Sequence, residues 1–440
     1  MRYAHADVRK SFFLDMFTRD ISLEDCILDL IDNSLDAFIN REKLRISDLI
    51  FDGNLRSDRL INAKIDVSCS ERQVKIVDNC GGIDRDRAQN EVFCFGHLPD
   101  ETPGKLGAYG VGLKRALFKI GKKFSIVSRT PKEGFEVILN TEEWAAKEEW
   151  KIPITFIDGS SSVKTAGTSI TITDLHEEVK MRMQEGGVPK RVFRDAASTY
   201  PFFLEKYADV SINDEPVPAN PILIGQSKEI TAGREQFEAN GVKVTLVASL
   251  TPMSSKANTG EQAGWNILCN GRVVVRADKT NLTGWGLDLP AFHSKYTSFV
   301  GLALFESDDP LTLPWTTTKR NVNQESAVYI RAKALMVTLT RPILTMLNAR
   351  YPSEPAEVAE IRDAVHNVKG VDFKELASKP SVGFSFAPPK KKIKRTARVV
   401  FDVALTDIEK IRRHLRRPAL SPSEIGRFAF DHYVRTECGD

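Results

Sequence analysis

Hydrophobic and polar positions follow two different periods along the chain. In residues 27–37 (ILDLIDNSLDA), apolar side chains recur at helical spacing, which predicts an amphipathic helix. Farther along, short apolar or alternating runs bounded by polar turns predict strands, and a long apolar pattern predicts a helix from about Ser326 to Leu347. Mixed strands and helices of this kind indicate an α+β fold. The strand candidates beyond residue 185 include residues 208–214, 242–250, 265–278 and 299–307.

The predicted helix at residues 27–37 has a polar face. Asp29, Asn33 and Asp36 stand at positions i, i+4 and i+7, so their side chains project from one side. An amide one turn after an acid can coordinate a hydrated Mg²⁺ while the acid orients a water, which suits phosphoanhydride hydrolysis. The plainer interpretation is a buried asparagine that caps a neighbouring loop.

A second motif follows a predicted strand. The apolar run Val74–Val77 ends in Asp78, and Cys80, Gly81 and Gly82 come directly after it. An acid at a strand end can accept a hydrogen bond from an exocyclic amine, and glycines let a flat ring approach the backbone closely. An ordinary Asp-Asn-Gly turn is the alternative interpretation.

The third motif is a glycine-rich loop that leads into a helix, in residues 105–121 (KLGAYGVGLKRALFKIG). Gly107, Gly110 and Gly112 precede Lys114, and the helix is expected to begin near Val111. Glycines before a helix leave backbone N–H groups free to face phosphate oxygens, and the helix dipole adds to the attraction. The pattern G-x-x-G-x-G differs from both the Rossmann and the P-loop motifs.

Together the three motifs resemble the GHKL superfamily of ATPases: gyrase B, the heat-shock chaperones related to it, histidine kinases and MutL, with MORC proteins as close relatives. The resemblance covers roughly residues 10–345. It implies a GHKL (Bergerat) α/β sandwich ATP-binding domain at residues 1–180 and a transducer-like α+β domain at residues 185–350. ATP and Mg²⁺ are the implied cofactors.

The resemblance also implies a role for each matching position. Asn33 would hold Mg²⁺, Asp78 would bind the adenine amine, and Gly82 would let the base lie flat. The glycine loop and Lys114 would wrap the triphosphate beneath a lid near residues 91–110. Thr168, in GTSITITDL, would support the adenine-binding aspartate through water, although a plain edge strand is the alternative. The implied nucleotide-binding residues are Asn33, Asp36, Asp78, Gly82, Gly107, Gly110, Val111, Gly112, Lys114 and Thr168.

Two positions depart from the family pattern. Asp29 stands where ATP-hydrolysing members carry Glu, and a misplacement of about 1 Å in a catalytic group can cost roughly 10²-fold in rate. Asp29 is nevertheless the expected general base, with Asp32 as the alternative. Cys80 replaces the first glycine of the family's D-x-G-x-G motif, which affects the expected backbone geometry more than adenine binding.

The transducer of the family sends a lysine to the γ-phosphate. Lys319, in PWTTTKRNV, is the best match, and Arg320 is the neighbouring alternative. A charged surface loop is the plainer interpretation of this segment. Asn270 and Gly271, followed by Arg272, predict a tight hairpin turn, to which no catalytic role is assigned.

Composition agrees with a large globular protein. With 440 residues and 42% hydrophobic content, the chain can bury two or three domain cores. It contains neither a long apolar run nor a signal-peptide start, so no membrane partner is expected. Its six cysteines lack metal-ligand or C-x-x-C spacing, which favours a reducing cytoplasm.

The formal net charge of +3 is unevenly distributed. Residues 390–440 contain thirteen Lys or Arg and seven Asp or Glu, so this tail carries +6 and the rest of the chain −3. Residues 351–395 are interpreted as a linker and basic segment, in which residues 369–389 hold Gly, Ser and Pro without periodicity. The run PPKKKIKRTAR follows; a run of this kind is usually a solvated tether, but it can also neutralise nucleic-acid phosphates.

The last segment, residues 396–440, predicts a strand, a helix, a turn and a second helix. Pro418 lies in the turn, and Ser421 or Ser423 can cap the second helix, with Glu424 in its first turn. The order resembles the ribbon-helix-helix fold, in which two chains pair their strands and bind DNA. Asp402 on the same strand face would repel phosphates, so a plain dimerisation tail is an equal alternative.

These observations lead to one expected function and two alternatives. The chain is expected to be an ATP-binding, slowly hydrolysing GHKL ATPase that forms an ATP-gated dimeric clamp. DNA is its expected partner, in genome maintenance or defence, with or without a separate effector protein. One alternative is a chaperone-like ATPase with a protein client. The other is a non-hydrolysing ATP-sensing switch. A histidine kinase is disfavoured because no phosphoacceptor-helix pattern surrounds any of the seven histidines.

Overall fold

The computed structural model describes residues 8–51, 62–95, 105–107, 110–158, 166–252, 262–349, 361, 363–387 and 399–438. The chain divides into two compact units, Met1–Pro389 and Lys390–Asp440. Within the described residues, the fold is mixed α+β, as the sequence predicts. None of the described helices combines the length and the hydropathy that a membrane crossing needs.

The first layer of the larger unit is an eight-stranded sheet in the order β5-β4-β3-β6-β2-β1-β7-β8. Strands β1 and β7 pair in parallel, and all other neighbours are antiparallel. Burial alternates along β1, where Ile65 and Val67 are buried while Lys64 and Ser68 are exposed, so one face of the sheet is packed and the other is solvated. The strands are β1 Ala63–Cys69, β2 Gln73–Asp78, β3 Gly121–Arg129, β4 Glu133–Asn140, β5 Thr155–Asp158, β6 Gly167–Leu175, β7 Ala208–Ile212 and β8 Glu215–Pro216.

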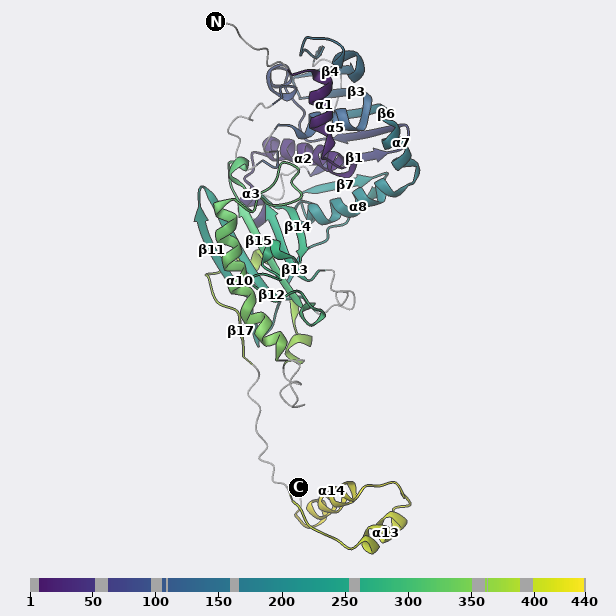
Figure 1. Ribbon diagram of the computed structural model, residues 1–440, viewed down its shortest axis with the longest axis vertical. Helices are drawn as coiled ribbons and strands as arrows, with labels where there is room; N and C mark the ends of the chain where they lie inside the picture. The colour runs from purple at the N-terminus through teal and green to yellow at the C-terminus, as the bar shows by residue number, and fades with distance from the viewer. Residues whose placement is uncertain are drawn as a thin grey trace. The chain divides into compact units, whose positions relative to one another are not determined.

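Helices cover the packed face of this sheet (Figure 1). The central one is α2, Leu23–Glu42, which contacts α5, α8 and β1. Ser22 caps its N-terminus by accepting the Asp25 N–H, and Lys43 ends it in the left-handed conformation at φ 52°. The other helices of this layer are α1 Lys10–Arg19, α3 Ile46–Phe51, α4 Arg85–Arg87, η1 Ala88–Val92, α5 Gly112–Ile120, α6 Thr141–Ala145, α7 Glu177–Gln184, α8 Gly187–Thr199 and α9 Pro201–Leu204.

The second layer is a sheet in the order β14-β13-β15-β12-β9-β16, with β11 also paired to β12. Helix α10, Ala327–Asn348, packs across one face of this sheet, close to the helix expected at residues 326–347. The opposite face contributes Val247, Val300 and Leu302 to the same apolar core as α2, so the two layers share one continuous interior. Its strands are β9 Leu223–Gln226, β11 Gly233–Ala239, β12 Val242–Leu250, β13 Gly264–Cys269, β14 Arg272–Asp278, β15 Phe299–Glu306 and β16 Lys369–Asp372.

Shorter elements complete the larger unit. The 3-10 helices η3 Asn281–Thr283, η4 Ser294–Tyr296 and η5 Pro310–Thr312 lie in the connections of the second layer. Helix α12, Phe373–Ala377, follows β16 directly, and a two-stranded sheet pairs β10 Ile230–Thr231 with β17 Ser385–Phe386.

Two segments lie differently from the expected domain division. Residues 208–212 were expected in the transducer-like part, but they form β7, which pairs with β1 and extends the first sheet. The linker interpretation of residues 369–387 is wrong, because β16 pairs with β9 and α12 buries Phe373 and Leu376. The Gly, Ser and Pro content of this segment favoured a linker, and its strands are too short to show a periodic pattern that would have indicated these contacts.

The smaller unit contains α13 Leu405–His414, α14 Pro422–Tyr433 and η6 Val434–Cys438. Of the two expected caps, Ser421 and Ser423, Ser421 caps α14, and it forms a capping box with Glu424. The strand expected at the start of this unit is not formed at residues 399–404, because no described residue of the unit pairs with their backbone. The basic run at residues 388–398 lies outside the described residues.

Candidate functional site

A cavity of about 400 Å³ opens in the larger unit along one side of α2. Among the described residues, it is lined by α2, the segment after β2 (residues 80–83), α4 and η1, the glycine loop with the start of α5, and the loop that carries Lys319. The lining residues that the sequence singles out are Asp29, Asn33, Asp36, Gly82, Gly107, Gly110, Val111, Gly112, Lys114 and Lys319. Asp78 and Thr168 are not among the described residues that line it.

Helix α2 presents a stripe of polar side chains to the cavity. Asp29, Asn33, Asp36 and Asn40 recur at helical spacing and all line it. The Asn33 side-chain nitrogen and the Asn40 side-chain oxygen are buried without a hydrogen-bond partner among the described residues. Unpaired polar atoms that line a cavity fit a ligand that supplies the missing partners. This finding also argues against Asn33 as a loop cap.

The residues present fit Mg²⁺ as one of those ligands. Mg²⁺ is held by oxygen ligands and usually takes only one or two from the protein, while waters and substrate phosphates supply the others. The Asn33 amide offers one such oxygen at the cavity, and its unpaired side-chain nitrogen can donate to a water or a phosphate oxygen beside the ion. Asn33 is therefore the residue that would hold the ion.

Asp32 and Asp29 have different surroundings although both lie on α2. Asp32 is fully buried and accepts hydrogen bonds from Tyr200 (2.6 Å), Arg272 (3.0 Å to one oxygen and 3.2 Å to the other) and Lys319 (2.6 Å). Burial alone would raise the pKa of Asp32, but Arg272 and Lys319 hold it below its usual range. A carboxylate with three donors cannot take a proton from a water in the cavity. The structure thus favours Asp29 over Asp32 as the candidate base.

Asp29 keeps a carboxylate oxygen available at the cavity. Its other oxygen lies 3.5 Å from the Lys319 ammonium. Burial raises the pKa of Asp29, while Lys319 acts in the opposite direction. A Cβ at position 112 would lie 3.1 Å from the Asp29 side chain, so glycine at this position lets the start of α5 approach the acid closely.

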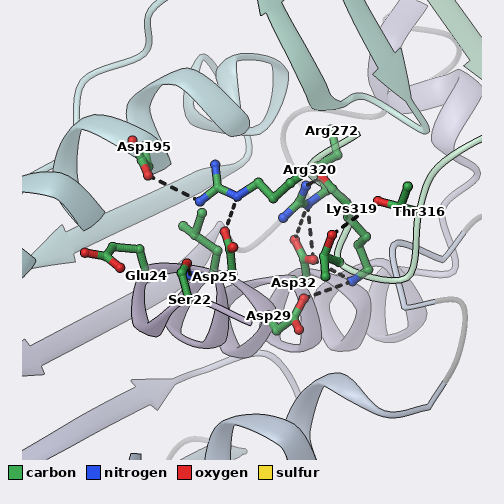
Figure 2. A network of polar contacts seen from close by, with 12 residues as sticks. Ser22, Glu24, Asp25, Asp29, Asp32, Asp195, Arg272, Thr316, Lys319 and Arg320 are labelled. Atoms are coloured by element: carbon green, nitrogen blue, oxygen red, sulfur yellow. Dashed lines mark hydrogen bonds and ion pairs between the residues drawn. The ribbon is translucent and has the colours of Figure 1, made fainter. Parts of the chain in front are cut away.

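The loop of residues 314–322 carries Lys319 into the interior. Lys319 adopts a left-handed backbone conformation, with φ 54°, and its N–H donates to Thr316 in a turn. Only 5% of Lys319 is exposed, so the surface-loop interpretation is wrong. Figure 2 shows Lys319 pointing toward Asp29 and Asp32, whereas Arg320 points away to Asp25 and Asp195. Of these two residues, Lys319 lines the cavity and Arg320 does not.

The glycine loop is tied to α2 through Asp36. One carboxylate oxygen of Asp36 accepts the Leu106 N–H (2.6 Å), and the other accepts the Gly107 N–H (2.7 Å). Burial raises the pKa of Asp36 to about 6, against the effect of these two hydrogen bonds. Asp36 therefore anchors the base of the loop in this structure. Residues 96–104 and 108–109 of the expected lid lie outside the described residues.

Val111 and Gly112 begin α5, whose N-terminus faces the cavity. This end of the helix offers unpaired backbone N–H groups and the positive end of the helix dipole, which suit phosphate. The family resemblance implies that Lys114 wraps the triphosphate, but here its ammonium donates to the Val92 and Cys94 carbonyls at 2.9 and 2.8 Å. Burial lowers the pKa of Lys114 to about 8. In this structure Lys114 holds the end of η1 beside the cavity.

Asp78 lies at the end of β2 with its carboxylate already hydrogen-bonded. It accepts from the Ser34 hydroxyl (2.9 Å) and from the N–H groups of Cys80 (2.8 Å) and Thr168 (3.2 Å). Thr168 thus contacts Asp78 directly through its backbone, and its hydroxyl pairs with Ser128 at 2.8 Å. Because β6 lies between β3 and β2, the edge-strand interpretation of Thr168 is wrong.

Gly82 is required by the protein backbone itself. Its φ is +72°, and a Cβ at this position would lie 2.0 Å from the Arg129 carbonyl oxygen. The neighbouring Cys80 is buried and lines the cavity in place of the family's glycine. Close backbone packing, in addition to any flat ligand, explains the glycine at position 82.

Sequence reasoning missed four residues of this site: Ser34, Asn40, Tyr200 and Arg272. Asn40 shares the polar face of α2 with Asp29, Asn33 and Asp36, so helical spacing could have found it. Ser34 lies on another face of α2 and bonds to Asp78, which helical spacing does not predict. Tyr200 and Arg272 reach Asp32 from α8 and β14, and no local pattern predicts such distant contacts.

Comparison with known proteins agrees with this geometry. Residues 21–168 match the model of the family described as histidine kinase-, DNA gyrase B- and HSP90-like ATPase. The chain has no match among curated proteins. The family match supports the GHKL superfamily for this segment, and with it ATP binding and ATPase chemistry in general. The matched range contains the three sequence motifs and Thr168, but it ends before Lys319.

Proposed function

We propose that this protein binds ATP with Mg²⁺ in the α2 cavity and hydrolyses it. One observation carries the proposal: Asp29, from the first layer, and Lys319, from the second layer, meet at one cavity. The Lys319 ammonium lies 3.5 Å from an Asp29 carboxylate oxygen. An acid beside a cation at a helix N-terminus suits attack of water on a phosphate. The GHKL match over residues 21–168 supports the choice of ATP.

Each residue has a defined role in this proposal. Asp29 orients the attacking water and accepts its proton, and the burial that raises its pKa makes it a better proton acceptor. Lys319 binds the γ-phosphate, and the N-terminus of α5 binds the remaining phosphate oxygens. Asn33 holds Mg²⁺, which neutralises phosphate charge when bound. Asp78 lies at the end of β2, outside the described cavity lining, and it would accept the adenine amine with the oxygen that bonds to Ser34, which keeps a second lone pair.

ATP contacts both layers of the larger unit in this proposal, and this double contact explains how it could close a clamp. Lys319 belongs to the second layer while the other phosphate-binding residues belong to the first, so only ATP, with its γ-phosphate, would link both layers. A ligand favours the conformation with which it makes more contacts, so ATP favours a closed state. We propose that the closed state is a homodimer that acts on DNA, in the manner of MutL and MORC relatives. The excess of positive charge in residues 390–440 supports this choice of partner.

The first experiment is steady-state ATP hydrolysis by the full chain and by Asp29→Asn and Asn33→Ala, with and without double-stranded DNA at low and moderate salt. We expect turnover that is lost in both variants and rises with DNA at low salt. Sedimentation with and without ATP tests dimer formation. Stimulation by unfolded polypeptide instead of DNA would support a chaperone-like ATPase, and ATP binding without turnover would support a nucleotide-sensing switch.

A further inference from the structure

The hairpin turn between β13 and β14 contacts several parts of the cavity wall. Asn270 and Gly271 adopt left-handed conformations, with φ 48° and 79°. The Asn270 amide donates to the Lys105 carbonyl at 3.2 Å, directly before the glycine loop, and to the Ser307 carbonyl at 3.0 Å. Arg272 follows and turns its side chain toward α2 (Figure 2). This turn has no role in the proposed function.

Arg272 holds two residues at once. Its Nε donates to both oxygens of Asp32, and its Nη1 donates to the backbone carbonyl of Lys319 at 2.6 Å. The guanidinium is buried and lies 5.9 Å from the centre of the Tyr200 ring. Arginine suits this geometry because its planar group presents several donors in fixed directions. The side chain therefore connects α2 to the Lys319 loop.

We propose that Arg272 is a positioning residue that sets the Lys319 loop for contact with the γ-phosphate. The inference rests on the proposed function. Arg272 fixes the carbonyl of Lys319, and thereby the left-handed turn that directs the ammonium into the cavity. It also provides the charge that stays with Asp32 when Lys319 moves to a phosphate. Arg272 itself does not line the cavity, so it acts through Lys319.

The charges around Asp32 support the role of Arg272 as the cation that remains with Asp32 when Lys319 binds a phosphate. The charged or titratable groups that contact Asp32 are Lys319, Arg272 and Tyr200, and Asp29 lies on the other side of Lys319. Without Arg272, transfer of Lys319 to a phosphate would leave Asp32 buried with no cation, which is strongly unfavourable. With Arg272 in place, Asp32 keeps a hydrogen-bonded counter-charge throughout.

The test compares affinities for a non-hydrolysable ATP analogue and for ADP in the full chain. We expect Arg272→Met to lower the preference for the ATP analogue about tenfold, because it weakens a contact to a charged group, while ADP affinity stays constant. Lys319→Met should lower the preference similarly. The decisive measurement is the double variant: Arg272→Met should have no further effect when Lys319 is already Met. Additive losses would overturn the proposal.

Controls separate this role from general damage to the fold. Arg276→Met removes a half-buried arginine of the same strand that bonds to the Ser198 carbonyl, and it should leave the preference unchanged. Arg272→Lys keeps the positive charge but cannot donate to Asp32 and to the Lys319 carbonyl at the same time. A full loss of the preference for the ATP analogue over ADP in this variant would show that the donor geometry, and not the charge, sets the Lys319 loop. Failure of the wild type to bind either nucleotide would reject the proposed function rather than this inference.

Replacement of the buried Arg272 could unfold the protein, so a second measurement uses the wild type alone. Amide hydrogen exchange is compared in the wild type with the ATP analogue and with ADP. We expect the ATP analogue, and not ADP, to slow exchange in residues 314–322 and in residues 270–275 together. Protection of residues 314–322 alone would contradict the proposed coupling.

Discussion

Lys319 donates a 2.6 Å hydrogen bond to Asp32, a residue 287 positions earlier in the chain. The contact leaves Asp29, at 3.5 Å from the same ammonium, with the weaker interaction and with an oxygen facing the cavity. Two acids one turn apart on the same helix are thereby separated into a structural anchor and a candidate base.

Asp29→Asn should abolish hydrolysis without abolishing nucleotide binding. General base catalysis contributes about 10²- to 10⁴-fold, so we expect kcat to fall by about 10² or more while the ATP dissociation constant changes little. Steady-state kinetics and equilibrium binding on the same preparation check this outcome. Turnover that survives in Asp29→Asn would contradict the assignment.

Asp32→Asn should act on stability instead. The substitution leaves Arg272 and Lys319 buried without their carboxylate, and removal of one partner from such a group costs about 3–5 kcal/mol. Denaturant unfolding measures this loss. Comparison with Asp29→Asn is the control: a smaller loss of stability in Asp32→Asn than in Asp29→Asn would show that the anchor is misidentified.

Lys319→Met should shift the pH dependence of kcat. Lys319 lowers the pKa of Asp29, so loss of the ammonium raises that pKa, and the base stays protonated to higher pH. The acidic limb of the kcat profile should therefore move to higher pH. An unmoved limb, measured on the residual activity, would indicate that Lys319 does not contact the base.

Because of Asp36, the free energy of unfolding should fall as the pH rises, whereas a salt-bridged acid makes it rise. Its folded pKa of about 6 lies above the unfolded value, so the unfolded state releases its proton first as the pH rises. Between about pH 4 and pH 6 the free energy of unfolding should fall by up to about 3 kcal/mol, and the effect should be constant above that range.

Asp36→Asn should remove this dependence. Unfolding free energies of wild type and variant are compared across this pH range, with Asp288→Asn as a control at an exposed carboxylate. Parallel curves for wild type and Asp36→Asn would rule out the titration.

Gly82→Ala should destabilise the protein severely, because alanine meets both a left-handed backbone and the Arg129 carbonyl. We expect a loss of about 3 kcal/mol or more, together with loss of nucleotide binding. Gly186 provides a matched control, since its φ is +68° and no atom lies within 4 Å of an added Cβ. Gly186→Ala should cost about 1 kcal/mol. Equal losses would mean that the contact with Arg129 is unimportant.

The parts of the site that lie close together in sequence could be predicted. Helical spacing predicted that Asp29, Asn33 and Asp36 share one face of α2. The glycine loop predicted a helix that begins near Val111, and α5 begins at Gly112. These inferences need only the period of one helix. The position of Lys319 required the family resemblance, because no local pattern connects it with α2.

Contacts between distant segments could not be predicted. Arg272 and Asp32 are 240 residues apart, and a buried arginine has the same sequence pattern as one in an exposed hairpin. Strand β7 has an alternating pattern that suits either sheet, so only its pairing with β1 decides its place. Such choices depend on which surfaces meet in the folded chain.

The pairing of β16 with β9 determines how the protein can be divided for expression. A fragment that stops after α10 would expose the backbone of β9 as an open edge and uncover Phe202, which packs against Phe373. Open edges and apolar surface of this kind cause chains to associate. A soluble fragment that carries the cavity should therefore extend through Ala387.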